Sequence, residues 1–217
     1  MSATRFKVCC IQDGVEMRMA ADAGATFAGL VGAMPSGPGP IPDARIAELV
    51  AGAPTGITPV LLTERADAEG IADHLQVTGV AAVQLVRHVP APVREELRRR
   101  VPGLTILQVV HVEGPASVAE AERLAEGADY LLLDSGRPGA AVAELGGTGR
   151  THDWSVSAAI VAASPVPVLL AGGLRPENVA AAVQAVGPWG VDVCSGLRGT
   201  AGRLDQGRLT AFARALA

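Results

Sequence analysis

The chain has 217 residues, of which 49% are hydrophobic and 3% aromatic, and its 18 basic and 22 acidic side chains leave a net charge of −4. This length suits one domain over residues 1–217 that buries roughly 70% of its unfolded surface. The small negative charge and the few aromatic rings argue against nucleic acid or an acidic membrane as a partner.

The sequence shows no sign of export or of a metal. No stretch of about 18 apolar residues lacks a charge or proline, and residues 1–7 lack the basic-then-apolar order of a signal peptide, so we expect a cytoplasmic protein. The three cysteines, Cys9, Cys10 and Cys194, include no C-x-x-C pair and no zinc spacing. Neither a disulfide framework nor a metal site is predicted.

Short apolar runs rich in β-branched residues alternate with amphipathic segments about every 25 residues, without a linker that could separate domains. Strands are predicted over 6–11, 25–32, 58–63, 80–86, 104–112, 130–133, 166–170 and 191–193. Helices are predicted over 14–23, 43–50, 66–77, 92–100, 117–126, 153–163, from Pro176 onward, and over 205–216. Because the strands are apolar on both faces, the pattern predicts an α/β fold, a single-domain (β/α)8 TIM barrel.

Two strand ends near the carboxyl terminus are closed by small residues. Gly172 and Gly173 follow the strand over 166–170, and Ser195 and Gly196 follow the next strand. Glycines let backbone amides approach an anion, and a helix opening at Pro176 would add partial positive charge. In such barrels the turns after the last two strands bind phosphate, so we predict a phosphate site at these four residues.

The carboxyl ends of the strands carry the active sites of such barrels, so polar residues there are candidates for chemistry. They include Cys9, Gln84, His111, Asp134 and Asp192. A satisfied structural histidine is the more frequent interpretation of a residue such as His111.

The other histidines point less clearly to chemistry. His74 and His88, on a helix and in a loop, are expected at the surface. Trp154 and Trp189 are expected to pack at junctions of helices and loops.

Cys9 and Asp134 could form an acid–base pair. Cys9 lies two residues after Lys7, so both side chains share one strand face, and Cys10 is expected in the helix-facing layer. A thiolate at position 9 could act as base or nucleophile, although a strand cysteine is more often part of the core. Burial would raise the pKa of Asp134 and let it act as a general acid, unless it only caps or closes a loop.

Residues 146–150 form a glycine-rich loop that lacks the lysine and the spacing of a nucleotide-binding P-loop. We interpret Gly147, Thr148 and Gly149 as a lid that closes over the site and excludes water. A flexible surface loop is the alternative interpretation.

Several segments resemble the phosphoribosylanthranilate isomerase family of tryptophan biosynthesis. The most specific are Gly-Gly-Thr-Gly-Arg-Thr-His-Asp-Trp at 146–154 and Leu-Ala-Gly-Gly-Leu-Arg-Pro-Glu-Asn-Val at 170–179, and further matches run in order from 7–11 to 191–196. The resemblance implies an Amadori rearrangement of an aminoaldose to an aminoketose, without metal or cofactor. It also implies that Cys9 removes the proton at the second carbon of the sugar and that Asp134 protonates the ring oxygen.

The sequence departs from this family on the aglycone side. The family has Ser-Pro-Arg in the loop after the second strand, with the arginine holding the anthranilate carboxylate, where this chain has Ser-Gly-Pro at 36–38. The family's strand-four histidine is replaced by Val86, a glutamate by Arg198, and bulky aromatics by Gly32 and Ala33. A lost charge-assisted hydrogen bond costs about 1.5–3 kcal/mol, so anthranilate recognition should weaken while the acid and base remain.

The leading hypothesis is therefore an isomerase of phosphoribosylanthranilate, a small phosphorylated sugar substrate, acting as a monomer or homodimer. Gln84, His111, Asp192 and Arg198 are the predicted substrate contacts, and Arg87, His111 or Arg198 could replace the missing carboxylate ligand. One alternative is a relative that isomerises or cleaves another ribosyl phosphate adduct. Another is a barrel that binds a sugar phosphate without turnover.

Overall fold

The computed structural model describes residues 4–35, 39–135 and 153–217. Its strands are β1 (Arg5–Val8), β2 (Phe27–Val31), β3 (Thr58–Thr63), β4 (Ala82–Leu85), β5 (Thr105–His111), β6 (Tyr130–Asp134), β7 (Val168–Leu170) and β8 (Gly190–Val193). Its helices are α1 (Gly14–Asp22), α2 (Asp43–Ala51), α3 (Ala68–Thr78), α4 (Ala91–Arg100), α5 (Ser117–Ala125), α6 (Trp154–Ala163), α7 (Val179–Val186), the 3₁₀ turn η1 (Ser195–Leu197) and α8 (Gln206–Ala215).

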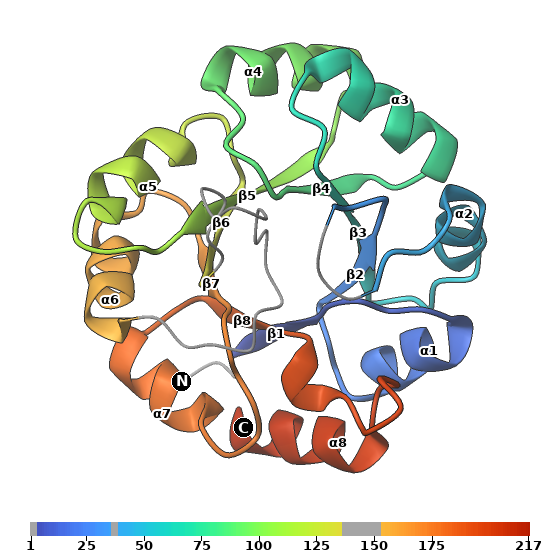
Figure 1. Ribbon diagram of the computed structural model, residues 1–217, viewed down its shortest axis with the longest axis vertical. Coiled ribbons are helices and arrows are strands. Elements are labelled where there is room, and N and C mark those ends of the chain that lie inside the picture. Colours follow the sequence, from blue (N-terminus) through green and yellow to red (C-terminus); the bar gives the residue numbers. More distant parts are fainter. Residues whose placement is uncertain (1–3, 36–38, 136–152) are drawn as a thin grey trace.

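Within the described residues, the eight strands run parallel and close into a barrel in chain order, because β8 pairs back with β1. The α-helices form a ring around this barrel, each following the strand of the same number (Figure 1). The predicted (β/α)8 barrel is therefore confirmed. The carboxyl ends of all the strands meet at one mouth of the barrel, which is where the polar candidates were expected.

Helix α7 begins later than predicted. The helix was expected to open at Pro176, but residues 176–178 form a turn and α7 begins at Val179. Asn178 explains the delay, because its side chain accepts from the Arg175 amide at 2.8 Å and donates to the Gly173 carbonyl at 3.1 Å. These two bonds close a separate loop ahead of the helix and hold the glycine turn after β7.

The barrel interior is a packed core, because alternate strand residues point inward. Phe27, Val60, Leu107, Leu132 and Leu169 come from five strands and pack together in the lumen. The intervening residues face the helices and form the larger apolar layer between the sheet and the ring of helices. This alternation determines which polar side chains enter the lumen and which lie outside it.

Aromatic rings close the amino-terminal end of the lumen. The ring of Tyr130 lies 5.6 Å from that of Phe27 and 5.0 Å from that of Trp189, measured between centroids. The guanidinium of Arg5 lies 4.8 Å from the centre of the Trp189 ring, a cation–π contact. Trp189 therefore packs inside the barrel, and the carboxyl-terminal mouth is the open end.

Candidate active site

A buried ion pair lies in the lumen below the end of β1. Lys7 is fully buried, and its Nζ lies 2.9 Å from Oδ1 of Asp192, its partner in register on β8. A side chain drawn at Gly29 on β2 would place its Cβ 3.1 Å from this Nζ and 2.8 Å from Cys9 Sγ. The sulfur and the ammonium group therefore both lie against the bare backbone of Gly29, within about 6 Å of each other.

Cys10 does not lie in the helix-facing layer, so this prediction is wrong. Its φ angle of 64° is in the left-handed region, which ends the strand alternation and turns the side chain into the upper lumen. There it packs in a cluster with Cys9 and Val86, and its Sγ accepts from Cys194 Sγ at 2.6 Å. A non-glycine residue in this region costs on the order of 1–3 kcal/mol, and such strain clusters at functional sites.

The neighbours of Cys9 favour its thiolate. A hydrogen bond from Cys10 lowers the pKa of Cys9 most, burial opposes that change, and the nearby Lys7 ammonium lowers the pKa again. The pKa of Cys10 is raised by its hydrogen bonds to Cys194 and Cys9 and by burial. Cys10 thus keeps its proton and can donate to Cys9, so Cys9 is the thiol of this cluster that is best suited to ionise.

Asp134 has the opposite perturbation. It ends β6 in register with His111 on β5, and its Oδ1 accepts from the Ser135 amide at 2.8 Å. Burial raises the pKa of this carboxyl, and the Ser135 amide and His111 offset only part of the increase. Asp134 is therefore suited to hold a proton and donate it as a general acid.

Three buried polar atoms near this mouth have no partner among the described residues: Nδ1 of His111, Oε1 of Gln84 and Nε of Arg198. The other ring nitrogen of His111 lies 3.1 Å from the Val86 carbonyl oxygen, so Nε2 carries a proton and donates there. Buried polar atoms without partners are costly, and a ligand that bonded them would remove this cost. Gln84 and His111 are therefore positioned as ligand contacts.

The loops after β7 and β8 lie in direct contact. Gly172 and Gly173 have φ angles of 89° and 63°. A Cβ added at Gly196 would lie 2.0 Å from the Leu174 carbonyl oxygen, so only glycine fits between the loops. Within the described part of the chain, the amides of Gly172, Gly173, Ser195 and Gly196 have no acceptor. Four such donors on two adjoining turns can hold an anion.

Replacing Gly196 by alanine should test this arrangement. The added methyl group must push the two loops apart, and we expect affinity for inorganic phosphate or ribose 5-phosphate to fall tenfold to a hundredfold, the equivalent of one charge-assisted hydrogen bond. The matched control is Gly199→Ala, whose Cβ would meet nothing closer than 3.9 Å. Titration calorimetry measures both, and equal affinities in the two variants would contradict the phosphate site.

Arg198 and Arg87 already have carboxylate partners. Nη1 of Arg198 lies 3.1 and 3.0 Å from the two carboxylate oxygens of Glu16, and its Nη2 donates to the carbonyl oxygens of Cys9 and Cys10 at 3.0 and 2.6 Å. Arg87 pairs with Glu64 at 2.9 Å. Arg198 thus braces the end of β1 with its two terminal nitrogens, and its Nε is the atom left for the predicted contact with the substrate. Asp192, another predicted contact, is held by its ion pair.

His74 is buried, so its predicted surface position is wrong. Its ring nitrogens lie 3.1 Å from Thr63 Oγ1 and 3.0 Å from Asp43 Oδ1. A Cβ at Gly32 would lie 2.6 Å from the His74 ring, which therefore occupies the space that a side chain at position 32 would take. Helical periodicity could have revealed this, because His74 shares the buried face of α3 with Ile71 and Thr78.

Some predictions fall outside the described residues. These are the lid residues Gly147, Thr148 and Gly149 and the loop at 36–38. Among the residues that are described, no group of three or more His, Cys, Asp or Glu could hold a metal ion. In that same part of the chain, no helix is long and apolar enough to cross a membrane.

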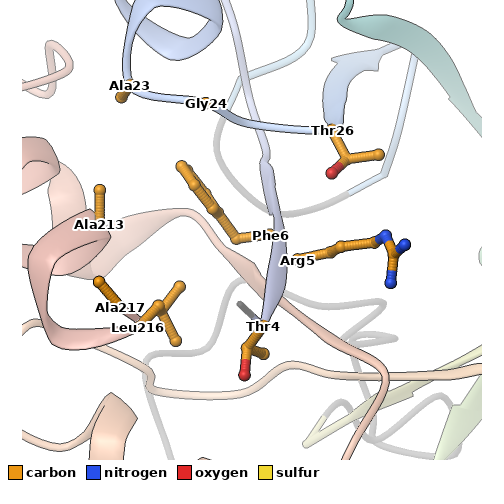
Figure 2. A pocket seen from close by; sticks show the side chains of 9 residues that line it. All are labelled: Thr4, Arg5, Phe6, Ala23, Gly24, Thr26, Ala213, Leu216 and Ala217. Atoms are coloured by element: carbon orange, nitrogen blue, oxygen red, sulfur yellow. The ribbon is translucent and has the colours of Figure 1, made fainter. Parts of the chain in front are cut away.

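A cavity of about 260 Å³ lies at the amino-terminal end of the strands (Figure 2). Figure 2 shows that Phe6 and Arg5 lie on opposite sides of β1, with Phe6 on the side of Ala23 and Ala213. Among its described lining residues, no side chain is a carboxylate, thiol or imidazole, and the other members are Thr4, Gly24, Thr26, Leu216 and Ala217. This cavity is therefore separate from the acid–base pair at the opposite mouth.

Comparison with known proteins gives one family. Residues 6–215 match the family described as N-(5'-phosphoribosyl)anthranilate (PRA) isomerase. The chain is 37% identical over 209 residues to N-(5'-phosphoribosyl)anthranilate isomerase 2 of Methanosarcina mazei, covering 96% of this chain and 92% of the relative. It is 37% identical over 219 residues to the isomerase of Rhodospirillum rubrum, covering 100% and 99%.

Solved structures agree. The phosphoribosyl anthranilate isomerase of Thermotoga maritima superposes with a TM-score of 0.84 at 26% identity, covering 98% of each chain. Another phosphoribosyl anthranilate isomerase, solved in complex with reduced 1-(o-carboxyphenylamino)-1-deoxyribulose 5-phosphate, shares the fold with a TM-score of 0.81 at 24% identity, again covering 98% of each chain. A closed barrel with a thiol and a carboxyl at its mouth thus accompanies sequence similarity along nearly the whole chain. The chain belongs to the N-(5'-phosphoribosyl)anthranilate isomerase family of tryptophan biosynthesis, whose members are isomerases that need no cofactor.

Proposed function

We propose that Cys9 is the general base and Asp134 the general acid of an Amadori rearrangement that converts N-(5'-phosphoribosyl)anthranilate into the 1-deoxyribulose 5-phosphate product. The opposite pKa shifts of these two lumenal groups carry this assignment, since Cys9 is lowered and Asp134 is raised. Such shifts favour an ionised base and a protonated acid in one site.

The steps follow from these protonation states. Asp134 donates its proton to the furanose ring oxygen, the bond from that oxygen to C1 breaks, and the nitrogen lone pair forms a C1=N iminium. The Cys9 thiolate then takes the proton from C2, the C–H electron pair forms a C1=C2 bond, and the iminium pair returns to nitrogen. The resulting enol becomes the ketone when C1 gains a proton and the C2 hydroxyl loses one. Each proton transfer contributes about 10²- to 10⁴-fold in rate.

Substrate recognition is proposed to use both turns and the orphaned polar atoms. The amides of Gly172, Gly173, Ser195 and Gly196 hold the phosphate. The Nδ1 atom of His111, which has no partner among the described residues, faces the aglycone in place of the arginine that the family carries in the loop after its second strand. Gln84 Oε1 accepts from the substrate, and the free oxygen of the Asp192 carboxylate is left for a sugar hydroxyl.

A fluorescence assay tests the proposed function. Phosphoribosylanthranilate fluoresces, and we expect its signal to disappear when the purified protein is added. If the signal persists while the reduced product analogue binds tightly, the protein is a sugar-phosphate-binding barrel without turnover. If only another ribosyl phosphate adduct is consumed, the aglycone has changed.

Two features of the proposed enzyme remain predictions. The chain works as a monomer or a homodimer, which light scattering of the purified protein distinguishes. The proposed cytoplasmic location awaits fractionation of cells that express the protein.

A further inference from the structure

We propose that Lys7 is a positioning residue for catalysis: anchored by Asp192, its ammonium group lies beside Cys9 against Gly29 and holds that sulfur as a thiolate in the lumen. This role rests on the proposed function of Cys9 as the base. It adds a residue that the acid–base pair alone does not require.

Burying the charge of Lys7 costs desolvation free energy. Its side chain is fully buried, and among the described residues its ion-pair partner is Asp192 at 2.9 Å. A buried ion pair is generally no more stabilising than a pair of apolar side chains of the same size. The described lumen around it is largely apolar, so packing alone would be satisfied by a leucine or methionine at position 7. A buried cation here points to a task beyond stability.

The backbone of β2 fixes the distance between the ammonium group and the sulfur. Nζ of Lys7 and Sγ of Cys9 lie 3.1 and 2.8 Å from the position that a Cβ of Gly29 would occupy. Because residue 29 is glycine, the β2 backbone places no side chain of its own between the two groups. Glycine at position 29 therefore lets the cation and the sulfur come close together, and any larger residue would displace one of them.

Asp192 fixes the direction of the ammonium group and keeps it charged. Burial alone would lower the pKa of Lys7, but the carboxylate of Asp192 and the neighbouring sulfurs raise it above the usual value for lysine. Lys7 thus stays protonated through the whole range in which a thiol titrates. Its charge is constant, and a change of protonation at this place belongs to Cys9.

Other charged and titratable groups surround Cys9 and act on it together with Lys7. Cys10 donates a hydrogen bond, and the carboxylate of Asp192 opposes the thiolate more weakly than Lys7 favours it. Arg198 bonds the Cys9 carbonyl oxygen, while Cys194, His111 and Asp134 complete the mouth. Among these groups, Lys7 is the cation whose charged atom lies on the same wall as the sulfur.

The test measures the ionisation of Cys9 without substrate. Alkylation of Cys9 by iodoacetamide is followed against pH, with tandem mass spectrometry to separate it from Cys10 and Cys194. We expect Lys7→Met to move the midpoint upward by one to two pH units, and the doubly neutral Lys7→Met with Asp192→Asn to move it upward by less, because the opposing carboxylate is removed as well. The shift in Lys7→Met is a tenfold to hundredfold slower reaction at neutral pH. The double variant leaves no unpaired buried charge, which protects its folding.

Arg5→Met is the matched control. Arg5 lies on the same face of β1, two residues below Lys7, and its guanidinium rests on Trp189 rather than near the sulfur. Its midpoint should equal that of the wild type. In the Lys7 variants the acidic limb of the pH profile of kcat/KM should move with the alkylation midpoint. The affinity for the reduced product analogue should stay within about twofold of that of the protein that keeps Lys7, which is the wild type for Lys7→Met and Asp192→Asn for the double variant.

A folded double variant with an unchanged Cys9 midpoint would overturn the role of Lys7. The outcome is independent of the proposed function, because alkylation needs no substrate. A wild-type protein that fails to turn over phosphoribosylanthranilate but shows the Lys7-dependent midpoint would refute the function and keep only the stabilisation of the Cys9 thiolate by Lys7.

Discussion

Replacing Cys9 by alanine should lower kcat about 10²- to 10⁴-fold, the contribution of a general base, and leave binding of the phosphate end intact. The sulfur faces the lumen beside Gly29, whereas the phosphate amides belong to the loops after β7 and β8. Alanine removes the base without adding bulk to this crowded wall. The decay of substrate fluorescence measures kcat, and calorimetry with the reduced product analogue measures binding.

Cys194→Ala is the control for this experiment. Cys194 donates to Cys10, one step away from the base, so we expect a much smaller loss of activity than in Cys9→Ala. Near wild-type activity in Cys9→Ala would show that another group removes the proton. An equal loss in both variants would mean that the sulfur cluster acts by holding the loops rather than through the Cys9 thiolate.

Asp134→Asn should also lower kcat about 10²- to 10⁴-fold, because an amide cannot release a proton to the ring oxygen. The amide oxygen can still accept from Ser135, so the loop should keep its geometry. In the wild type, activity should decline as pH rises through the raised pKa of Asp134, since the proton to be donated is then lost. The pH profile of kcat/KM measures this alkaline limb.

The same substitution should stabilise the fold at neutral pH. A carboxyl whose folded pKa is raised binds its proton more tightly in the folded than in the unfolded chain, so stability falls as pH rises above the ordinary value for aspartate. Asparagine removes this cost at neutral pH and has no such effect in acid, where both states are protonated. The exposed Asp73→Asn is the control, with no change in activity or melting temperature. Full activity in Asp134→Asn would exclude Asp134 as the acid.

Much of the barrel was predictable because its elements obey simple periodicities. The strand over 58–63 has the predicted ends, and every other predicted strand and helix is present with one or both ends shifted. Strand β1 is shorter than predicted, ending at Val8, because the chain turns at Cys10. Period-two patterns fix the face of a residue only while the backbone stays extended.

The predicted positions of Cys10 and His74 are wrong for two different physical reasons. The left-handed backbone at Cys10 has no signal in a single sequence, since cysteine rarely adopts it. The position of His74 does have a signal in the sequence, because the apolar periodicity of α3 includes it. A polar residue on such a face indicates a buried bond, here to Thr63 and Asp43.

The ion pair between Lys7 and Asp192 was only half predictable. The shared face of Lys7 and Cys9 follows from strand alternation. Its partner lies 185 residues away and is brought near only when β8 closes the barrel against β1. The register of that closing pair depends on the whole ring of strands.

The aromatic rings at the amino-terminal end of the lumen have a kinetic consequence. Phe27, Tyr130 and Trp189 fill that end of the lumen. Substrate entry and product release therefore both use the carboxyl-terminal mouth. Departing ketose and arriving aldose therefore exclude each other, and accumulated product should act as a purely competitive inhibitor of its own formation.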